Sequence, residues 1–119
     1  RGTVDEVAAR TVQTMVDCGA TPGAIRAYIG PCLSPEAFEV GPEVAAQFAD
    51  AVVVRPDGAE RPHVDLKAAL HHQLTGAGVF ADAVEVSDRC TLQEHDHFFS
   101  YRAADGPTGR MFGAIVLRQ

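Results

Sequence analysis

The sequence predicts a mixed fold, of the α/β or α+β kind, formed by a single segment that spans residues 1–119. Apolar residues recur at helical spacing in two long stretches, and short runs of β-branched residues follow each of them. Hydrophobic residues make up 46% of the chain and charged residues 22%, which is enough apolar side chain to form a core. The length of 119 residues is that of one domain.

The first helix is predicted to begin at Thr3. Thr3 and Glu6 are spaced as a capping box, in which each side chain satisfies an exposed backbone amide of the other residue. Apolar residues then follow at helical spacing as far as Val16, and Gly19 favours a helix end. The β-branched and aromatic alternation of residues 25–29 predicts a strand after this helix.

Two proline motifs predict short helices in the middle of the chain. Ser34-Pro35 and Gly41-Pro42 each place proline at the first helical position. The missing N–H of proline costs nothing there, because a backbone N–H at that position has no acceptor within the helix. Residues 51–54 are a compact β-branched run and predict a strand, which a Pro-Asp-Gly turn closes.

A second long helix and two more strands are predicted in the rest of the chain. Asp65 can cap a helix whose apolar positions fall within residues 66–74, and residues 84–86 indicate a strand. Residues 111–117 are apolar on both faces, which is typical of a strand buried in a sheet. This order of helices and strands predicts at least one parallel pairing.

Composition and charge exclude several classes of function. The formal net charge of −6 argues against a nucleic-acid partner, because binding a phosphate backbone takes a basic face. The apolar runs are too short for a membrane span, and the N-terminus has no secretory pattern. The three cysteines, Cys18, Cys32 and Cys90, are too widely spaced for a disulfide framework, so we expect reduced thiols and a cytoplasmic location.

Cys32 and Cys90 each lie just beyond a predicted strand. Sites in α/β sheets gather at the carboxyl ends of strands, which makes both cysteines catalytic candidates. Either thiol would act as a nucleophile if a nearby histidine lowered its pKa. The alternative, which the frequent burial of cysteine favours, is that each one is a small apolar side chain of the core.

Histidines close to Cys90 suggest a metal site as one interpretation. His95 and His97 are two residues apart, so both rings would point the same way from extended backbone, and Glu94 and Asp96 add carboxylates. Recognisable zinc sites use tighter, paired spacings. The pattern therefore favours a polar loop, and no metal ligand is assigned within this chain.

Two arginines flank a Gly-Pro turn near the end of the chain. Arg102 and Arg110 carry forked guanidinium groups that suit phosphate or carboxylate, which makes them candidate binding residues for an anion. The Phe98-Phe99 pair before Arg102 is expected to be buried and to fix the local backbone. The alternative is a solvated surface arginine beside Asp105.

Six short motifs follow one another along the chain. They are Gly30-Pro31-Cys32-Leu33, Phe38-Glu39-Val40-Gly41, Asp65-Leu66, Cys90-Thr91, Phe99-Ser100-Tyr101-Arg102 and Thr108-Gly109-Arg110. In this order the motifs resemble the laccase-domain family, also called polyphenol oxidase, purine nucleoside phosphorylase or peptidoglycan editing factor. Each motif alone is weak, but all six in order, covering residues 1–118, are specific.

The resemblance implies a fold larger than this chain. Family members form a layered α/β/β/α sandwich similar to the cysteine-hydrolase-like fold, and this chain would be its C-terminal half. Their metal, zinc and in earlier interpretations copper, is bound by two histidines and one cysteine of the N-terminal half. These ligands would lie outside the present chain, because Arg1-Gly2 matches only the tail of the segment that carries the last one.

The activity that the resemblance implies is phosphorolysis of inosine, adenosine and methylthioadenosine, with adenosine deaminase side activity. Phenol oxidation, as by a laccase-like oxidoreductase, was the earlier interpretation. The partners would be a purine nucleoside, phosphate and the missing N-terminal half, with a homo-oligomer left open. Arg1, Arg102 and Arg110 become substrate-binding candidates. Ala103 stands where the family usually has a second arginine, which leaves the preferred nucleoside open.

Two alternatives differ from this interpretation. The first is a cysteine-hydrolase-type enzyme that uses Cys90 or Cys32 with a neighbouring histidine. The second is a degenerate, non-catalytic subunit or interaction module. Whether this chain alone is an enzyme stays open at this point.

Overall fold

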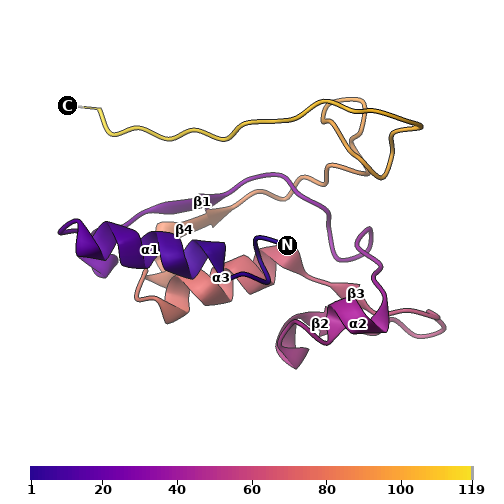
Figure 1. Cartoon of the computed structure of the whole chain (residues 1–119), viewed down its shortest axis with the longest axis horizontal. Coiled ribbons are helices and arrows are strands. Elements are labelled where there is room, and N and C mark those ends of the chain that lie inside the picture. Colours follow the sequence, from indigo (N-terminus) through magenta and orange to yellow (C-terminus); the bar gives the residue numbers. More distant parts are fainter. Residues whose placement is uncertain (119) are drawn as a thin grey trace.

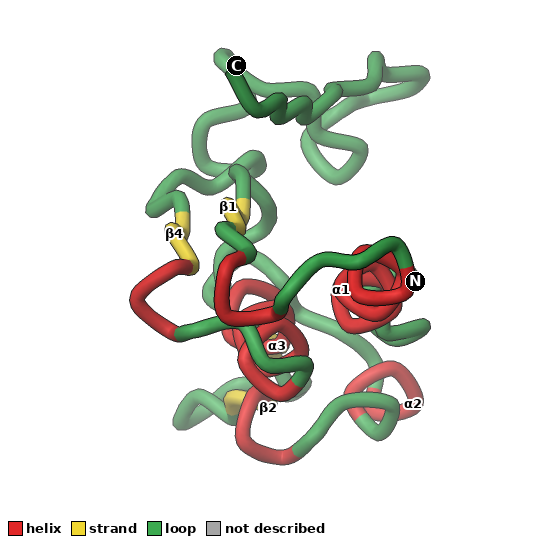
Figure 2. The backbone as a smooth tube through the Cα atoms, turned by 90° about the vertical axis from the view of Figure 1, so that its left-hand side faces the viewer, coloured by secondary structure: helices red, strands yellow, loops and turns green. Residues whose placement is uncertain are grey.

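The computed structural model describes residues 1–118, and its main body is layered (Figures 1 and 2). Helices α1 (Val7–Asp17) and α3 (Leu66–Gly76) lie on one side of a parallel pair of strands, β1 (Ala27–Ile29) and β4 (Val84–Val86). The C-terminal segment runs along the other side of this pair in both views. The mixed α/β class and the parallel pairing predicted from the sequence are confirmed.

A smaller unit follows β1 along the chain. It contains the short helix α2 (Pro42–Ala45) and an antiparallel pair of strands, β2 (Val53–Val54) and β3 (His63–Val64). Its buried residues are Val40, Ala45 and Val64. Three single 3-10 turns complete the described elements: η1 (Pro22–Ala24), η2 (Asp50–Val52) and η3 (Ala81–Ala83).

The main core lies between the two long helices and the parallel strands. The buried residues of this core are Val12, Ile25, Ile29, Leu74 and Val79. Each such side chain contributes about 1.5–3 kcal/mol by leaving water. α3 lies in the crossover between β1 and β4, which a parallel pair requires, and it covers one face of the strands.

α3 begins as its sequence predicts. The Asp65 carboxylate accepts a hydrogen bond from the Ala68 backbone N–H at 2.9 Å, which is an N-cap. After the helix the chain turns at Gly78, whose φ of 100° places it in the left-handed region. A Cβ added to Gly78 would come within 2.9 Å of the Pro22 Cβ, so glycine also permits close packing there.

α1 begins later than predicted, and the capping box is wrong. The helix starts at Val7, and Glu6 occupies the N-cap position with φ 55° and no side-chain capping bond. Backbone turns satisfy the first amides instead, with Val7 N–H donating to Gly2 O at 3.0 Å and Glu6 N–H to Thr3 O at 3.2 Å. The two side chains of the predicted box are therefore not needed as caps.

The two proline motifs behave differently. Gly41-Pro42 opens α2 as predicted. Ser34-Pro35 makes only one turn, in which Phe38 N–H donates to Ser34 O at 3.0 Å, so the predicted helix is wrong there. The chain leaves this turn because Phe38 O accepts a hydrogen bond from Val64 N–H at 3.1 Å, which draws it alongside β3.

The strand predicted at residues 51–54 is shorter in the structure. Its first half belongs to the 3-10 turn η2, and only Val53–Val54 pair with His63–Val64, a strand not predicted from the sequence. Pairing of this kind depends on a distant partner, which local patterns do not reveal.

The strand predicted at residues 111–117 is also wrong for the described chain. The segment is extended but has no ladder partner within residues 1–118, and its large side chains face solvent. Phe112 is 96% exposed and Leu117 93% exposed. Apolar sequence favours a strand only where a neighbouring strand supplies hydrogen bonds. Among residues 1–118, no helix is long and apolar enough to cross a membrane.

The Asp65 cap predicts a measurable loss of stability. Asp65→Ala should lower the free energy of unfolding by about 1 kcal/mol, because the Ala68 amide loses its acceptor. Asp57→Ala, at an exposed turn, is the matched control and should change it by less than about 0.5 kcal/mol. Urea denaturation measures both variants, and equal losses would contradict this role for Asp65.

Candidate functional site

The segments that follow β1 and β4 stay side by side beyond the two strands. Ser87 N–H donates to Ile29 O at 2.8 Å, and Thr91 N–H donates to Cys32 O at 3.1 Å. Cys32 and Cys90 are partners in an isolated parallel bridge. The predicted placement of both cysteines beyond strands is confirmed, and the structure adds that they are neighbours of each other.

Cys90 is buried, with 2% of its surface exposed, and its sulfur receives hydrogen bonds. Ser34 N–H donates to Cys90 Sγ at 3.3 Å. Burial raises the pKa of the Cys90 thiol, but hydrogen bonds from Gln93, Ser34 and Leu92 outweigh it and lower the pKa to about 7. A thiolate is therefore well populated near neutral pH.

The Ser34 hydroxyl belongs to the same surroundings. Its oxygen is buried and has no hydrogen-bond partner among residues 1–118. Because a hydroxyl can donate to an anionic sulfur, ionised Cys90 would supply the partner that Ser34 lacks.

Cys32 is more open than Cys90 and its thiol is less acidic. The residue is half-buried, and its own Sγ lies 3.6 Å from Leu33 O, to which the thiol donates. Burial raises the pKa of the Cys32 thiol; nearby Lys67 lowers it, whereas Asp65 and Cys90 raise it. The two thiols therefore differ in acidity, with Cys90 the stronger acid.

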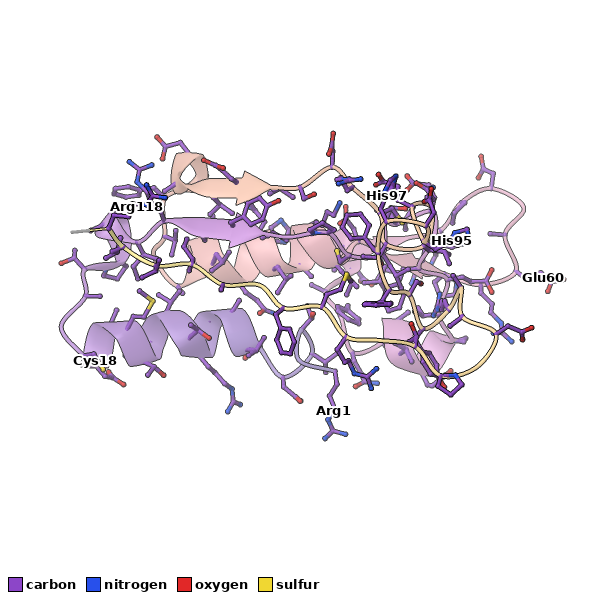
Figure 3. All side chains as sticks on the ribbon, turned by 90° about the horizontal axis from the view of Figure 1, so that it is seen from above. Arg1, Cys18, Glu60, His95, His97 and Arg118 are labelled. Atoms are coloured by element: carbon purple, nitrogen blue, oxygen red, sulfur yellow. The ribbon has the colours of Figure 1, made fainter. Side chains whose placement is uncertain are left out.

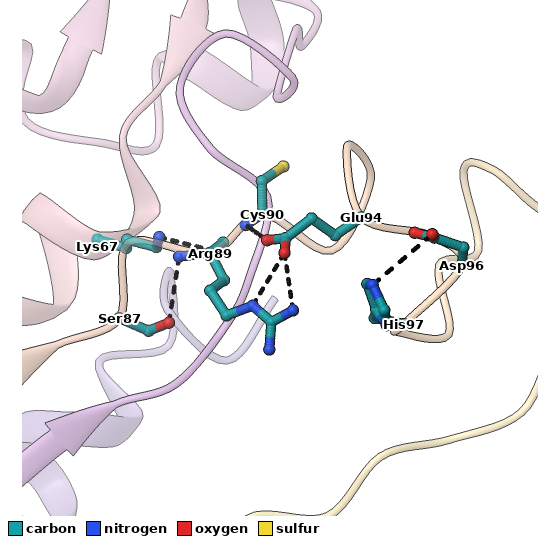
Figure 4. A network of polar contacts seen from close by, with 7 residues as sticks. All are labelled: Lys67, Ser87, Arg89, Cys90, Glu94, Asp96 and His97. Carbon is teal, nitrogen blue, oxygen red and sulfur yellow. Dashed lines mark hydrogen bonds and ion pairs between the residues drawn. The ribbon is translucent and has the colours of Figure 1, made fainter.

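An ion pair holds the loop that carries Cys90 (Figure 4). Arg89 donates to Glu94 Oε1 from Nε at 2.9 Å and from Nη2 at 2.8 Å, and Cys90 N–H donates to Glu94 Oε2 at 3.2 Å. Hydrogen bonding from Arg89 holds the pKa of Glu94 below its usual range. Lys67 Nζ donates to Arg89 O at 2.9 Å, and the Arg89 guanidinium lies 4.6 Å from the centre of the Phe98 ring.

The histidines near Cys90 do not gather into a metal site. His95 Nδ1 lies 3.0 Å from Leu92 O, and His97 Nε2 lies 3.7 Å from Asp96 Oδ2, while Glu94 binds Arg89. Figure 3 shows both histidines at one end of the molecule. Within residues 1–118, no three side chains of His, Cys, Asp or Glu are placed to hold a metal ion. The described residues therefore do not fit the metal that the resemblance implies.

The three candidate arginines make separate contacts. Arg102 Nη1 donates to Ala37 O at 3.1 Å. Arg1 Nε lies 3.4 Å from Asp5 Oδ2, and Arg110 is exposed. Among the described residues no ion pair joins Arg102 to Asp105, so the surface pair considered as the alternative is not formed.

Arg102 is held by aromatic contact as well, although not by the pair expected from the sequence. Its guanidinium lies 5.0 Å from the centre of the Phe38 ring. Phe98 is half-buried, but Phe99 is 56% exposed, so the expectation that both rings are buried is wrong. The contact with Phe38 depends on tertiary structure and has no signal in the local sequence.

Comparison with known proteins gives one family match and several close relatives. The family model described as multi-copper polyphenol oxidoreductase laccase matches residues 1–118. The chain is 43% identical over 121 residues to a purine nucleoside phosphorylase of Deinococcus radiodurans, covering 98% of this chain and 46% of that protein. It is 39% identical over 121 residues to adenosine deaminase RL5 of an unknown prokaryotic organism, covering 97% and 46%.

Two solved structures are similar in fold. YfiH of Bacillus licheniformis superposes with a TM-score of 0.79 at 27% identity, covering 86% of this chain and 41% of that one. YlmD of Geobacillus stearothermophilus has a TM-score of 0.75 at 30% identity, covering 86% and 40%. The chain spans about half the length of the curated relatives that it matches.

The hydrogen bonds around Cys90 predict a distinct pH profile. The rate at which a small haloacetamide alkylates Cys90 should rise with pH to a half-maximum near pH 7, because only the thiolate reacts. Ser34→Ala should move this midpoint upward, since the hydroxyl no longer stabilises the anion. Peptide mass spectrometry measures the rate at Cys90 itself.

Ser87→Ala provides the control, because the Ser87 hydroxyl accepts from Arg89 N–H rather than contacting the sulfur. This variant should leave the midpoint unchanged. A midpoint at or above that of free cysteine, ~8.5, in the unmodified protein would refute the acidic thiol.

Proposed function

Because the chain belongs to the multi-copper polyphenol oxidoreductase laccase family, we propose that it forms part of an enzyme that phosphorolyses purine nucleosides. The observation that carries the proposal is 43% identity, across 98% of this chain, to a purine nucleoside phosphorylase. We propose inosine, adenosine and methylthioadenosine as substrates. Adenosine deamination is a side activity in this proposal, supported by the 39% identity to adenosine deaminase RL5.

In phosphorolysis, a phosphate oxygen attacks the ribose carbon C1′ while the bond from C1′ to the purine nitrogen breaks. The task for this chain is to hold the phosphate anion in position. Arg102 suits that task, since its bond to Ala37 O and its place over Phe38 leave the rest of the guanidinium fork for an anion. Arg110 and Arg1 are exposed and are further candidates for the same anion.

The proposed site is completed by a part of the protein that this chain does not contain. The chain covers 46% of the phosphorylase relative, and the described residues offer no metal site. We place the zinc or copper ligands in the remaining part, which is also the partner of this chain. No chemical step of this chain depends on that metal.

The exposed apolar surfaces support the proposal that another part of the protein packs against this chain. Residues 111–117 present large apolar side chains to solvent, and Tyr28 on β1 is 59% exposed on a strand whose other face packs against helices. Large exposed apolar surfaces on soluble proteins often mark interaction sites. In the proposed whole protein, residues 111–117 pair as a strand of a second sheet, giving the layered α/β/β/α sandwich.

The two alternative functions are not favoured. A cysteine hydrolase needs a histidine against the nucleophile, and within residues 1–118 no histidine hydrogen-bonds to Cys32 or Cys90. A non-catalytic module is not favoured by relatives that are named as enzymes.

The direct test is release of purine base from inosine or adenosine. A protein of the relatives' full length should release hypoxanthine or adenine only when phosphate is present. Residues 1–119 alone should show no turnover, because half of a site retains little of the rate. Base release that does not depend on phosphate would reject phosphorolysis.

Arg102→Ala should weaken phosphate-dependent turnover of the complete protein by roughly ten- to hundredfold, because a charge-assisted bond contributes about 1.5–3 kcal/mol. Arg102→Lys should recover only part, since an ammonium lacks the planar fork. Arg10→Ala, at an exposed position on α1, is the matched control and should keep the parental rate. If the phosphate KM and kcat of Arg102→Ala are unchanged, Arg102 is not part of the site.

A further inference from the structure

The bridge between Cys32 and Cys90 places two thiols on adjacent chain segments in register. Neighbouring strands lie about 4.8 Å apart. A disulfide joins residues whose Cα atoms are about 4.4–6.8 Å apart, so bridge partners fall within its reach. Partners in a parallel bridge also direct their side chains to the same face of the sheet. Both residues are free thiols in the structure.

We propose that Cys32 and Cys90 form a redox-active dithiol, which a hydroperoxide closes to an intramolecular disulfide. This role is separate from the proposed nucleoside chemistry, because it uses neither the arginines nor a metal. It also requires no histidine, which the hydrolase alternative needs. The third cysteine takes no part, since Cys18 is exposed at the end of the molecule opposite His95 and His97 (Figure 3).

The surroundings assign different roles to the two sulfurs. Cys90 Sγ accepts a hydrogen bond from Ser34 N–H at 3.3 Å, which stabilises the sulfur as an anion. Cys90 is therefore the sulfur that attacks the oxidant. Cys32 is half-buried and its thiol stays protonated, which suits the second, resolving step.

The oxidation balances in two steps. The Cys90 thiolate attacks one oxygen of the hydroperoxide, the O–O bond breaks, and the other oxygen leaves and takes up a proton, which gives a sulfenic acid on Cys90. Cys32 sulfur then attacks the Cys90 sulfur, the S–O bond breaks, and hydroxide leaves as water with the proton from Cys32. Overall, two thiols and one hydroperoxide become a disulfide, an alcohol or water, and one further water.

The loop around Cys90 keeps this geometry in place. Glu94 accepts from Cys90 N–H and binds Arg89, while Lys67 donates to Arg89 O. On the other side, Thr91 N–H bonds to Cys32 O. Because these bonds fix both backbones, closing the disulfide needs rotation of two side chains rather than movement of a strand.

Hydrogen peroxide is the probe, because it is the smallest hydroperoxide and Cys90 keeps only 2% of its surface exposed. The protein carries Cys18→Ser, which removes the exposed thiol. Trypsin leaves Arg55-Pro56 and Arg61-Pro62 intact, so Cys32 lies in peptide 27–67 and Cys90 in peptide 90–102. We expect these peptides to be joined, with the mass of two hydrogens lost, and to separate again on reduction.

Single variants in the same background assign the order of the steps. Cys32→Ser should stop at a sulfenic acid on Cys90, which dimedone traps, whereas Cys90→Ser should leave Cys32 a thiol at the same peroxide dose. Circular dichroism before treatment checks that each variant is folded. Joined peptides in the Cys18→Ser protein support the proposal even if a single variant fails to fold.

The proposal is overturned if both cysteines remain thiols at a dose that fully oxidises free cysteine. It is also overturned if Cys90 proceeds to sulfinic or sulfonic acid without joining Cys32. Neither result would bear on phosphate-dependent base release, so this proposal and the proposed function fail independently.

Discussion

The parallel pairing of β1 with β4 is the constraint on which the rest of the structure depends. Parallel strands cannot be joined by a hairpin, so the chain must cross over, and α3 in that crossover buries one face of the pair. Beyond the strands the parallel pairing resumes with its register shifted by one residue, and this makes Cys32 and Cys90 neighbours. One topological requirement therefore accounts for both the main core and the candidate site.

The pairing also leaves one face of the sheet without helices. The C-terminal segment runs along that side (Figure 1), and large apolar side chains of residues 111–117 are exposed to solvent. The chain covers 46% of the phosphorylase relative's length. Under the proposed function, the present chain would supply an arginine for phosphate, and the metal ligands and a second sheet would come from outside it.

Several elements that depend on only a few adjacent residues were predicted correctly from the sequence. The Asp65 cap, the Gly41-Pro42 helix start and the strand at residues 84–86 each depend on a few adjacent residues, and the structure has all three. The Thr3 capping box failed because backbone turns satisfied the same amides first. The strand at residues 111–117 failed because apolar character cannot provide the neighbouring strand that a ladder needs.

The candidate site was likewise predictable only in the features that depend on local sequence. The sequence placed Cys32 and Cys90 beyond strands, but their partnership depends on the register of two strands far apart in the chain. The place of Arg102 over Phe38 likewise arises only in the folded chain. The motifs thus gave candidate residues, and tertiary pairing determined which of these candidates lie together.

Amide hydrogen exchange of the segment after β4 tests the parallel register most directly. If the pairing extends past the strands, the amides of Ser87 and Thr91, which donate to Ile29 O and Cys32 O, should be protected to a similar degree as the core of α3. Exchange of the Thr91 amide as fast as that of the unpaired residues 112–117 would contradict the account, because Cys32 and Cys90 would then not be held together.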